Sequence, residues 1–433
     1  MTNPTTAIAI KNNTGSSQAY AYVTGLDINN NYVPVFIQAD GKTVYRPSSP
    51  SAPQSALGAD VSIPLGAPGA TTTITIPQIA GGRIWFSKDA KLTFLLNPGP
   101  AVVEPSVTNT ADPNYNIAWG FCEFTYNQAQ LFVNISYVDF VGPIPIALEL
   151  RNAAGNVQSV LGLPAGGLDT VADRLVKQNA ADGAGWDKLV VKGPDGKTLR
   201  VLSPNSGRVA DGSLFQGYFD DYVSRVWSKY AASDLTINTQ ASWGDVTGRV
   251  QAGAGGGLLT FPNVGTFAKP SAGDIFSCST GPFGGYPEAT RDEMGALGAR
   301  IAAALNRSTL LDNPTQPDGE KIASYYKSNP TNHYARITHE VNLDGRGYAF
   351  PYDDVVPSGD AGPDQAGTVF DANPELLTVT IGGPAASNGP ANGGSGGGKK
   401  GGKDGDGQTG PASGFWGKLK SWLSALKKVL HIK

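Results

Sequence analysis

The segment from Trp119 to Val141, WGFCEFTYNQAQLFVNISYVDFV, is the most informative stretch of this chain of 433 residues. Its aromatic and β-branched residues predict two strands, joined by a hairpin that turns at Gln128–Ala129. Two carboxylates, Glu123 and Asp139, stand within this otherwise apolar sequence. A carboxylate on a half-buried strand loses solvation, so it is either well paired or present for chemistry.

The spacing of the two acids leaves their relation open. A regular hairpin places Glu123 opposite Asn134, and Asp139 then lies five residues further along, about 17 Å away at ~3.4 Å per residue. The two carboxylates meet only if the chain bends after Ser136, and the sequence does not predict that bend. On spacing alone, a charged residue that simply faces solvent is the more common interpretation.

The surrounding sequence predicts a mainly β fold with an α+β second lobe. Gly, Pro, Asn and Asp clusters separate short apolar runs up to about residue 150, which is typical of a sandwich or barrel. The expected strands are Ala7–Ile10, Ala19–Val23, Tyr32–Ile37, Thr72–Ile76, Arg83–Phe86, Leu92–Leu96, Phe121–Tyr126, Leu131–Ser136 and Ile144–Leu150.

From about residue 165 the apolar residues recur at the spacing of a helix. We expect a helix from near Leu168, a second capped by Ser213, and a third over Glu288 to Leu305. Residues 151–383 therefore predict a mixed α/β lobe, whose late strands return to the β lobe at 1–150. Strand-like runs between and after the helices are Leu189–Val191, Leu235–Ile237, Leu258–Phe261, Ala335–His339, Tyr348–Phe350 and Leu377–Ile381.

The C-terminal part differs in composition. Residues 384–414 are Gly-rich and predict a disordered linker, and residues 415–433 predict a basic amphipathic helix. Such a helix suits an anionic membrane surface or a protein partner, and docking on its own body is the alternative interpretation. Residues 399–433 carry a charge of +6, so the net charge of −3 leaves −9 for the remainder, which argues against nucleic acid as a ligand.

Cysteine and histidine are scarce. Cys122 and Cys278 either form one bridge or, as the more common case, Cys122 is a buried apolar residue. With three histidines far apart, no metal site is expected, and no cofactor motif is present. The N-terminus shows no signal peptide, so an extracellular or cell-wall location, leaderless export and an intracellular location all stay open.

The segment EFTYN (123–127), followed by LFVNISYVDFVG, resembles the active-site region of glycoside hydrolase family 64, endo-acting β-1,3-glucanases with a thaumatin-like fold. The resemblance implies a β-barrel or sandwich domain and a mixed α/β domain that flank a wide groove for β-1,3-glucan. Five further segments resemble the family in the same order, so the likeness spans roughly residues 5 to 383. They are FDDYVSRVW (219–227), DIFSCSTGPF (274–283), AALNRSTLL (303–311), NHYARITHE (332–340) and YAFPYDDV (348–355).

The resemblance also implies roles for the two acids. The family inverts the anomeric configuration, with Glu123 at the position of the general acid and Asp139 at that of the general base. Inverting enzymes hold the two carboxyls roughly 6.5–9.5 Å apart, so that the attacking water fits between them. Glu123 must stay protonated, which its apolar neighbours Phe121 and Phe124 favour, whereas Asp139 must stay ionised.

Several neighbouring residues are candidates for binding the sugar. Amides, hydroxyls and aromatic rings are the groups that hold neutral polysaccharides. The family tends to carry Trp where this chain has Phe132, so stacking is retained but its strength is in doubt. Asp353 and Asp354 are additional candidates, for which turn capping is the alternative interpretation. The candidates from the hairpin are Thr125, Asn127, Phe132, Asn134 and Ser136.

Two hypotheses follow from the sequence. The first is an inverting endo-β-1,3-glucanase without a cofactor, and the second is a non-catalytic thaumatin-like protein that binds glucan or acts on membranes. Retention of Glu123 and Asp139 favours the enzyme. Phe132 in place of Trp and the cationic C-terminal segment favour the second hypothesis.

Overall fold

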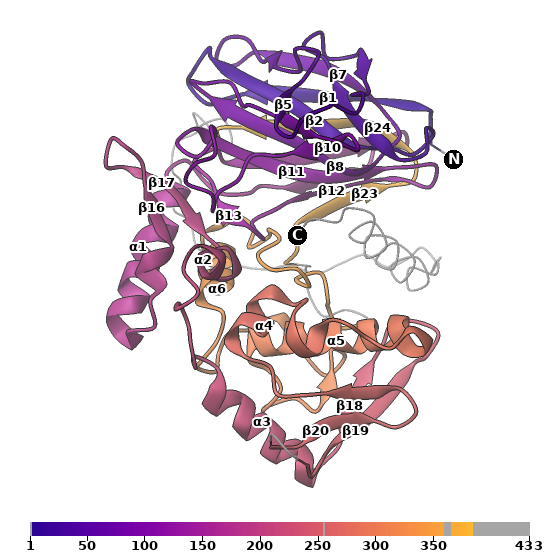
Figure 1. Cartoon of the computed structure of the whole chain (residues 1–433), viewed down its shortest axis with the longest axis vertical. Coiled ribbons are helices and arrows are strands. Elements are labelled where there is room, and N and C mark those ends of the chain that lie inside the picture. Colours follow the sequence, from indigo (N-terminus) through magenta and orange to yellow (C-terminus); the bar gives the residue numbers. More distant parts are fainter. Residues whose placement is uncertain (1, 254–255, 359–364, 384–433) are drawn as a thin grey trace, which may run out of the picture.

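The computed structural model describes residues 2–253, 256–358 and 365–383. Stacked β-sheets form one lobe, and helices with smaller sheets form the other (Figure 1). The expected linker at 384–414 and the expected helix at 415–433 lie outside the described residues. Within the described ranges, no helix is long and apolar enough to cross a membrane.

The larger sheet of the first lobe contains the hairpin from which the sequence analysis began. Its strand order is β23-β12-β11-β8-β2-β3-β4, with β6 paired to β2. Glu123 lies opposite Asn134, which confirms the register expected from a turn at Gln128–Ala129. The strands are β2 (Ala19–Asp27), β3 (Val33–Ile37), β4 (Val44–Tyr45), β6 (Ile63–Pro64), β8 (Ile79–Lys88), β11 (Ala118–Tyr126), β12 (Leu131–Ile135) and β23 (Thr368–Asp371).

The second sheet joins the two ends of the described chain. Its order is β15-β14-β24-β1-β7, and β1 and β24 pair in parallel, so the last described strand lies in the first lobe. A small sheet, β10-β9-β5, lies beside these two. The strands are β1 (Thr5–Asn12), β5 (Ser55–Ala56), β7 (Thr71–Pro77), β9 (Leu95–Asn97), β10 (Ala101–Val103), β14 (Ile146–Asn152), β15 (Val157–Val160) and β24 (Pro374–Ile381).

Alternation along the strands builds the core between the two large sheets. Ile84 and Val133 on one sheet and Ile8 and Val379 on the other are fully buried and belong to one hydrophobic cluster. Each sheet therefore turns an apolar face inward, as in a sandwich. Cys122 belongs to this core, and burial raises the pKa of its thiol to about 12. Cys122 and Cys278 are both buried and free, so they do not form the bridge that the sequence left open.

Gly82 is required for close packing between β8 and β11. It lies opposite Phe124, and a Cβ at position 82 would come within 2.4–2.7 Å of three atoms of the Phe124 ring. We expect Gly82→Ala to destabilise the protein by roughly 1–3 kcal/mol, because overpacking a core forces neighbouring groups to move. Thermal unfolding monitored by circular dichroism measures the effect. Gly212→Ala is the matched control, because no atom lies within 4 Å of a Cβ there; equal melting temperatures for both variants would contradict the expectation.

The second lobe combines helices with two smaller sheets (Figure 1). The sheet orders are β13-β17-β16 and β21-β20-β19-β18-β22. The strands are β13 (Phe140–Val141), β16 (Val190–Lys192), β17 (Thr198–Leu202), β18 (Leu235–Asn238), β19 (Asp245–Gln251), β20 (Leu258–Phe261), β21 (Gly265–Phe267) and β22 (Thr315–Gln316). The helices are α1 (Gly167–Asp182), α2 (Pro204–Ala210), α3 (Asp220–Ala232), α4 (Ala272–Ser277), α5 (Arg291–Arg307) and α6 (His333–Val341), with short 3₁₀ turns at Trp186–Leu189, Gly281–Phe283, Glu288–Thr290 and Ile322–Ser324.

The expected helices near Leu168 and over Glu288–Leu305 are confirmed as α1 and α5, but the expectation for α3 was wrong at its start. Ser213 does not cap this helix; its hydroxyl donates to Asp211. Phe215 and Gly217 have positive φ angles of 56° and 73°, which a right-handed helix does not accommodate. The helix therefore begins only at Asp220.

The segment Ala335–His339 was expected to be a strand and is part of α6. Asn332 caps this helix by accepting a hydrogen bond from the backbone N–H of Ala335. Tyr334, Ile337 and Val341 are buried on one side, which is helical spacing. The expected run at Tyr348–Phe350 forms only a single bridge, between Tyr348 and Ser136.

Candidate active site

A row of polar side chains crosses the larger sheet of the first lobe. Strand pairing sets Thr24 opposite Arg83, Arg83 opposite Glu123, Glu123 opposite Asn134, and Asn134 opposite Thr368. Directly opposed residues of neighbouring strands point to the same face of a sheet. Five strands thus contribute one polar row, on the face opposite the core that Ile84 and Val133 line.

Aromatic side chains flank this row on both sides. Trp85 and Phe121 lie two residues from Arg83 and Glu123 on the same face, with ring centroids 4.9 Å apart. On the other side Phe132 lies opposite Phe370, and the two rings are nearly parallel with centroids 6.4 Å apart. Phe370 is 43% exposed. Phe132 is partly buried, and the two rings together offer flat apolar surface beside the polar row, as sugar-binding surfaces do.

Glu123 is held by an arginine that also binds a second acid. The Nε of Arg83 donates to Oε1 of Glu123 at 3.2 Å, and its Nη1 donates to Oε2 of Glu104 at 2.6 Å. The side chains of Arg83, Glu104 and Glu123 are 29%, 35% and 34% exposed, so all three reach the surface. Glu123 is thus accessible to a ligand and fixed in direction.

Asp139 comes from a segment that leaves the sheet. The chain leaves the sheet after Ile135, because Tyr348 accepts a backbone hydrogen bond from Tyr137 and donates one to Ile135. The segment then runs to β13, where the Asp139 carbonyl accepts a hydrogen bond from the backbone of Ser203. This departure from the sheet is the bend that the sequence did not predict.

The charge of Asp139 acts on Arg83 together with two other acids. Burial would lower the pKa of the Arg83 guanidinium, but Glu104, Glu123 and Asp139 raise it, and the net pKa lies above its ordinary value. Arg83 is therefore a permanent cation. Asp139 and Glu123 both lie within electrostatic range of this one guanidinium, although they come from different segments.

The other candidates on the hairpin differ in their surroundings. Thr125, Asn134 and Ser136 are 6–8% exposed, so each has only a small surface available to a ligand. Asn127 follows the end of β11, and its Oδ1 accepts hydrogen bonds from the backbone of Ala129 and Gln130. Its side-chain oxygen therefore serves the hairpin turn.

Asp353 lies away from the surface, contrary to the expectation that it contacts sugar. It is 0% exposed, and its carboxylate accepts hydrogen bonds from Arg307 and from the backbone of Ala349 and lies 3.0 Å from Nε2 of His339. Burial would raise its pKa, but His339 and Arg307 lower it, and the net pKa is below the ordinary value. In the fold, Asp353 forms a buried ion pair with Arg307. Asp354 is partly buried, and its charge acts on Arg300.

Arg83, Glu104 and Phe370 were missed by the sequence analysis. Arg83 had a signal, because a cation inside the apolar run Arg83–Phe86 requires a partner. No signal for Glu104 or Phe370 was visible in the sequence. Phe370 joins the site through the pairing of β23 with β12, and Glu104 joins it through a side-chain contact with Arg83. The described residues contain no group of three or more His, Cys, Asp or Glu arranged to hold a metal ion.

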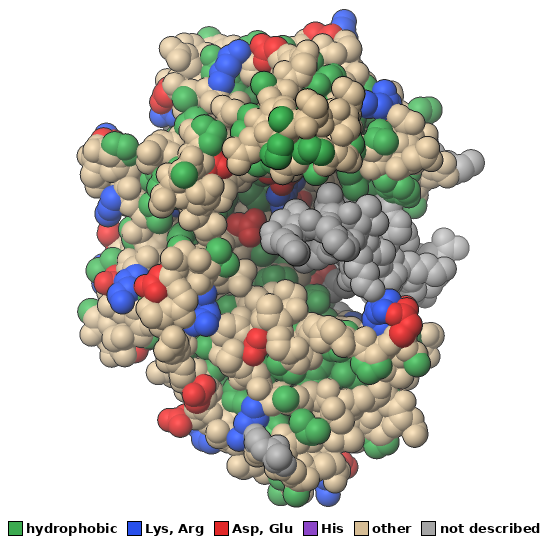
Figure 2. Space-filling view, viewed as in Figure 1, with side chains coloured by type: hydrophobic (Ala, Val, Ile, Leu, Met, Phe, Trp, Pro, Cys, Tyr) green, Lys and Arg blue, Asp and Glu red, His purple; other side chains and the backbone are tan. Residues whose placement is uncertain are grey.

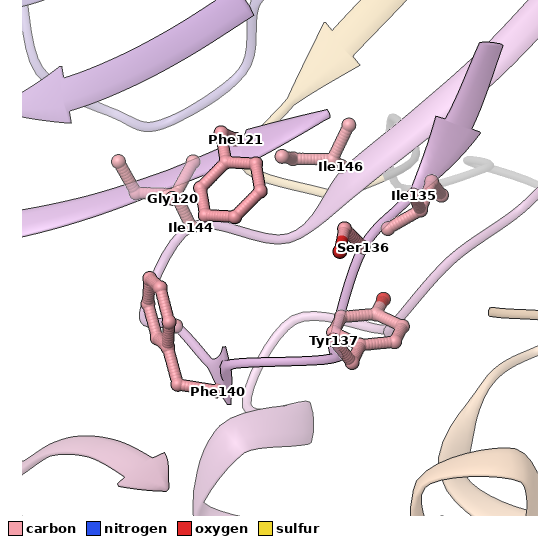
Figure 3. A pocket seen from close by; sticks show the side chains of 9 residues that line it. Gly120, Phe121, Ile135, Ser136, Tyr137, Phe140, Ile144 and Ile146 are labelled. Carbon is pink, nitrogen blue, oxygen red and sulfur yellow. The ribbon is translucent and has the colours of Figure 1, made fainter. Parts of the chain in front are cut away.

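The space around the site is open. Figure 2 shows that the surface is hollowed between the lobes and that acidic and basic side chains lie in this hollow. A small cavity behind the hairpin measures about 10 Å³, which suits one water molecule at most. Figure 3 shows the rings of Phe121, Tyr137 and Phe140 around it, with Ser136 nearby. This cavity is therefore too small to hold a sugar unit.

Comparisons with known proteins agree with one another. A family model for glycoside hydrolase family 64, described as beta-1,3-glucanase, matches residues 4–381. Glucan endo-1,3-beta-glucosidases from Cellulosimicrobium cellulans and Arthrobacter sp. (strain YCWD3) are each 31% identical, over 322 and 319 residues, which is 72% of this chain and 54% of each relative. The chain thus spans about half the length of the curated relatives it matches.

Solved structures show the same fold. The crystal structure of a laminaripentaose-producing beta-1,3-glucanase in complex with laminaritetraose matches with a TM-score of 0.75 and 33% identity, and covers 87% of this chain and 98% of that one. A beta-1,3-glucanase domain (GH64) from Clostridium beijerinckii matches with a TM-score of 0.65 and 22% identity, again over 87% and 98%. At that identity the second match concerns the fold alone.

Proposed function

The chain belongs to the glycoside hydrolase family 64 of β-1,3-glucanases, and we propose that it cleaves internal bonds of β-1,3-glucan with inversion at the anomeric carbon. Glu123 is the general acid and Asp139 is the general base. The observations that carry the proposal are the hydrogen bond from Arg83 to Glu123 and the action of the Asp139 charge on the same guanidinium, on the face of the larger sheet opposite the core.

The proposed reaction is a single displacement. Glu123 transfers its proton to the glycosidic oxygen as the bond to the anomeric carbon breaks, which releases the leaving chain as an alcohol. Asp139 accepts a proton from a water molecule, whose oxygen attacks the anomeric carbon from the opposite side. The β-linked substrate thus yields a product whose new reducing end is the α-anomer, and the two carboxyls are reset by exchanging protons with solvent.

The substrate lies across the polar row. Asn134 shares the row with Glu123, and Thr125 lies on the same face next to it, so both supply neutral hydrogen-bonding groups beside the acid. Phe132 lies roughly 8 Å from Glu123 and Phe370 roughly 12 Å, from the strand and residue spacings of a sheet. Both rings therefore lie within a few sugar units of Glu123, on the same face of the sheet.

The first experiment measures substrate choice. Purified protein is incubated with laminarin and curdlan, and with carboxymethylcellulose as a β-1,4-linked control, and reducing ends and oligosaccharides are measured. We expect products from the two β-1,3-glucans and none from the control. Binding to curdlan without release of any oligosaccharide would contradict the enzyme and favour a glucan-binding protein.

The contribution of stacking is tested at Phe132. Phe132→Ala is expected to raise KM for laminarin oligosaccharides about 5- to 10-fold with little change in kcat, because an aromatic contact contributes about 1 kcal/mol beyond its buried area. Phe132→Trp should lower KM, and Phe132→Leu should behave as Ala, since it retains apolar bulk without a flat ring. Steady-state kinetics distinguish the three variants, and an unchanged KM in Phe132→Ala would remove this residue from the binding surface.

A further inference from the structure

Glu123 stands at the end of a chain of hydrogen bonds. The indole N–H of Trp85 donates to the hydroxyl of Thr24 at 2.9 Å, and that hydroxyl donates to Oε1 of Glu104 at 3.4 Å. Arg83 then donates to Oε2 of Glu104 at 2.6 Å and to Oε1 of Glu123 at 3.2 Å. Glu104 is thus held from two sides, and Arg83 bridges the two glutamates.

Aromatic rings fix the guanidinium of Arg83 in place. Its central carbon lies 4.8 Å from the ring centroid of Phe121 and 5.3 Å from that of Trp85. Both rings are buried, so the arginine rests on an apolar surface that excludes water from one side. Charges act more strongly there than in bulk water. Arg83 contacts two carboxylates, and its contact with Glu104 (2.6 Å) is shorter than its contact with Glu123 (3.2 Å).

This arrangement resolves a conflict in the proposed chemistry. A general acid must carry a proton before each turnover, whereas an adjacent arginine favours the ionised carboxylate. Glu104 provides a second negative charge on the same guanidinium, and this charge opposes the effect of Arg83 on Glu123. Arg83 can therefore orient Glu123 while Glu104 offsets part of its charge.

We propose that Arg83 and Glu104 act as a positioning pair for Glu123: Arg83 fixes the direction of its carboxyl, and Glu104 offsets the charge of Arg83 so that Glu123 is reprotonated between turnovers. The inference rests on the proposed function. Among the described residues, the charge of Asp139, from the segment after β12, also acts on Arg83, and the neutral Thr24 and Asn134 lie beside the pair on the flanking strands. Tyr334 of α6 lies within electrostatic range of Asp139. Burial and, to a smaller extent, the charge of Asp139 raise the pKa of Tyr334, so the Tyr334 hydroxyl stays neutral.

The test is the pH dependence of kcat/KM for laminarin, whose alkaline limb reports the general acid. Glu104→Gln removes the offsetting charge, so the alkaline limb is expected to move to lower pH by roughly one unit. Arg83→Gln removes the cation, so the limb should move to higher pH, and kcat should fall about tenfold or more with little change in KM, because orientation is lost. Arg83→Lys should return the limb towards its original pH without restoring kcat, because an ammonium group lacks the fork of the guanidinium.

If Arg83 and Glu104 had only a structural role, Glu104→Gln and Arg83→Gln would not move the alkaline limb in opposite directions. Shifts of both variants in the same direction, or no shift in either, would overturn the positioning pair. Circular dichroism verifies that each variant folds; if Arg83→Gln does not, the shift in Glu104→Gln decides alone. Glu123→Gln is measured in parallel: full activity of that variant defeats the proposed function itself, whereas an inactive Glu123→Gln beside unshifted profiles defeats only the inference drawn from Arg83 and Glu104.

Discussion

Glu123→Gln is expected to lower kcat for laminarin hydrolysis by about 10²–10⁴-fold while glucan binding persists, because general acid catalysis contributes that range. The amide retains the shape of the side chain and can still meet Arg83, but it has no proton to transfer. Asp139→Asn should lose activity to a similar extent, because no base then activates the water. Glu149→Gln is the matched control, since Glu149 is an exposed carboxylate on β14, in the other large sheet.

Leaving-group chemistry separates the roles of the two acids. A β-laminaribiosyl fluoride needs no protonation of its leaving group, so Glu123→Gln should retain most of its activity on this substrate. Asp139→Asn should stay inactive on the fluoride, because attack by water still needs a base. The assignment would be contradicted if either variant hydrolysed laminarin at the normal rate, and the roles would be exchanged if Asp139→Asn alone were rescued by the fluoride.

Asp353→Asn is expected to destabilise the protein by about 3–5 kcal/mol, the cost of leaving a buried charge without its partner. The side chains of Arg307 and Asp353 are 1% and 0% exposed, and their closest contact is 3.2 Å. Arg307 also donates to the backbone carbonyls of Val355 and Asp353, so its charge cannot move to solvent when the carboxylate is removed. Urea unfolding at neutral pH measures the loss.

The effect of Asp353 on stability depends on pH with a definite sign. Its pKa in the folded protein is below the ordinary value, so its contribution is fully present above the unfolded pKa of about 3.9 and is lost as the pH falls through the folded pKa. The difference in stability between the wild type and Asp353→Asn should therefore shrink on acidification below about pH 4. Glu375→Gln is the control: its ion pair with Arg151 is about half exposed, and such pairs contribute about 0–1 kcal/mol. Equal losses for both variants would contradict a buried ion pair at Asp353.

Local patterns in the sequence predicted much of the first lobe. Alternating apolar residues located β1, β7, β12 and β14 to within two residues at each end, because half-buried strands need that period. The expected strands for β2, β8 and β11 were also found, but the observed strands extend three or four residues further at one end. The expected strand at Leu92–Leu96 was only partly correct, since β9 begins at Leu95. The turn at Gln128–Ala129 sufficed to predict that Glu123 lies opposite Asn134. These features depend on residues within about ten positions of one another.

Features that depend on distant partners could not be predicted. The path of Asp139 is set by hydrogen bonds between Tyr348 and the backbone of Ile135 and Tyr137, more than 200 residues earlier in the chain. Asp353 resembled a surface acid because nothing near it in the sequence indicates Arg307 and His339 as partners. The segment around Ile337 was mistaken for a strand because β-branched and aromatic residues outweighed a helical burial pattern that only the packing reveals. Tertiary contacts thus override the local secondary-structure preference of this segment.

The anomeric configuration of the first product tests a two-carboxylate inverting mechanism most directly. Soluble laminarin oligosaccharides are mixed with the protein, and the anomeric protons of the new reducing ends are followed by NMR within the first minutes, before mutarotation. Glu123 as acid and Asp139 as base predict that the α-anomer appears first and the β-anomer only later, by equilibration. Initial release of the β-anomer would mean retention of configuration and would contradict the mechanism, whatever the activity.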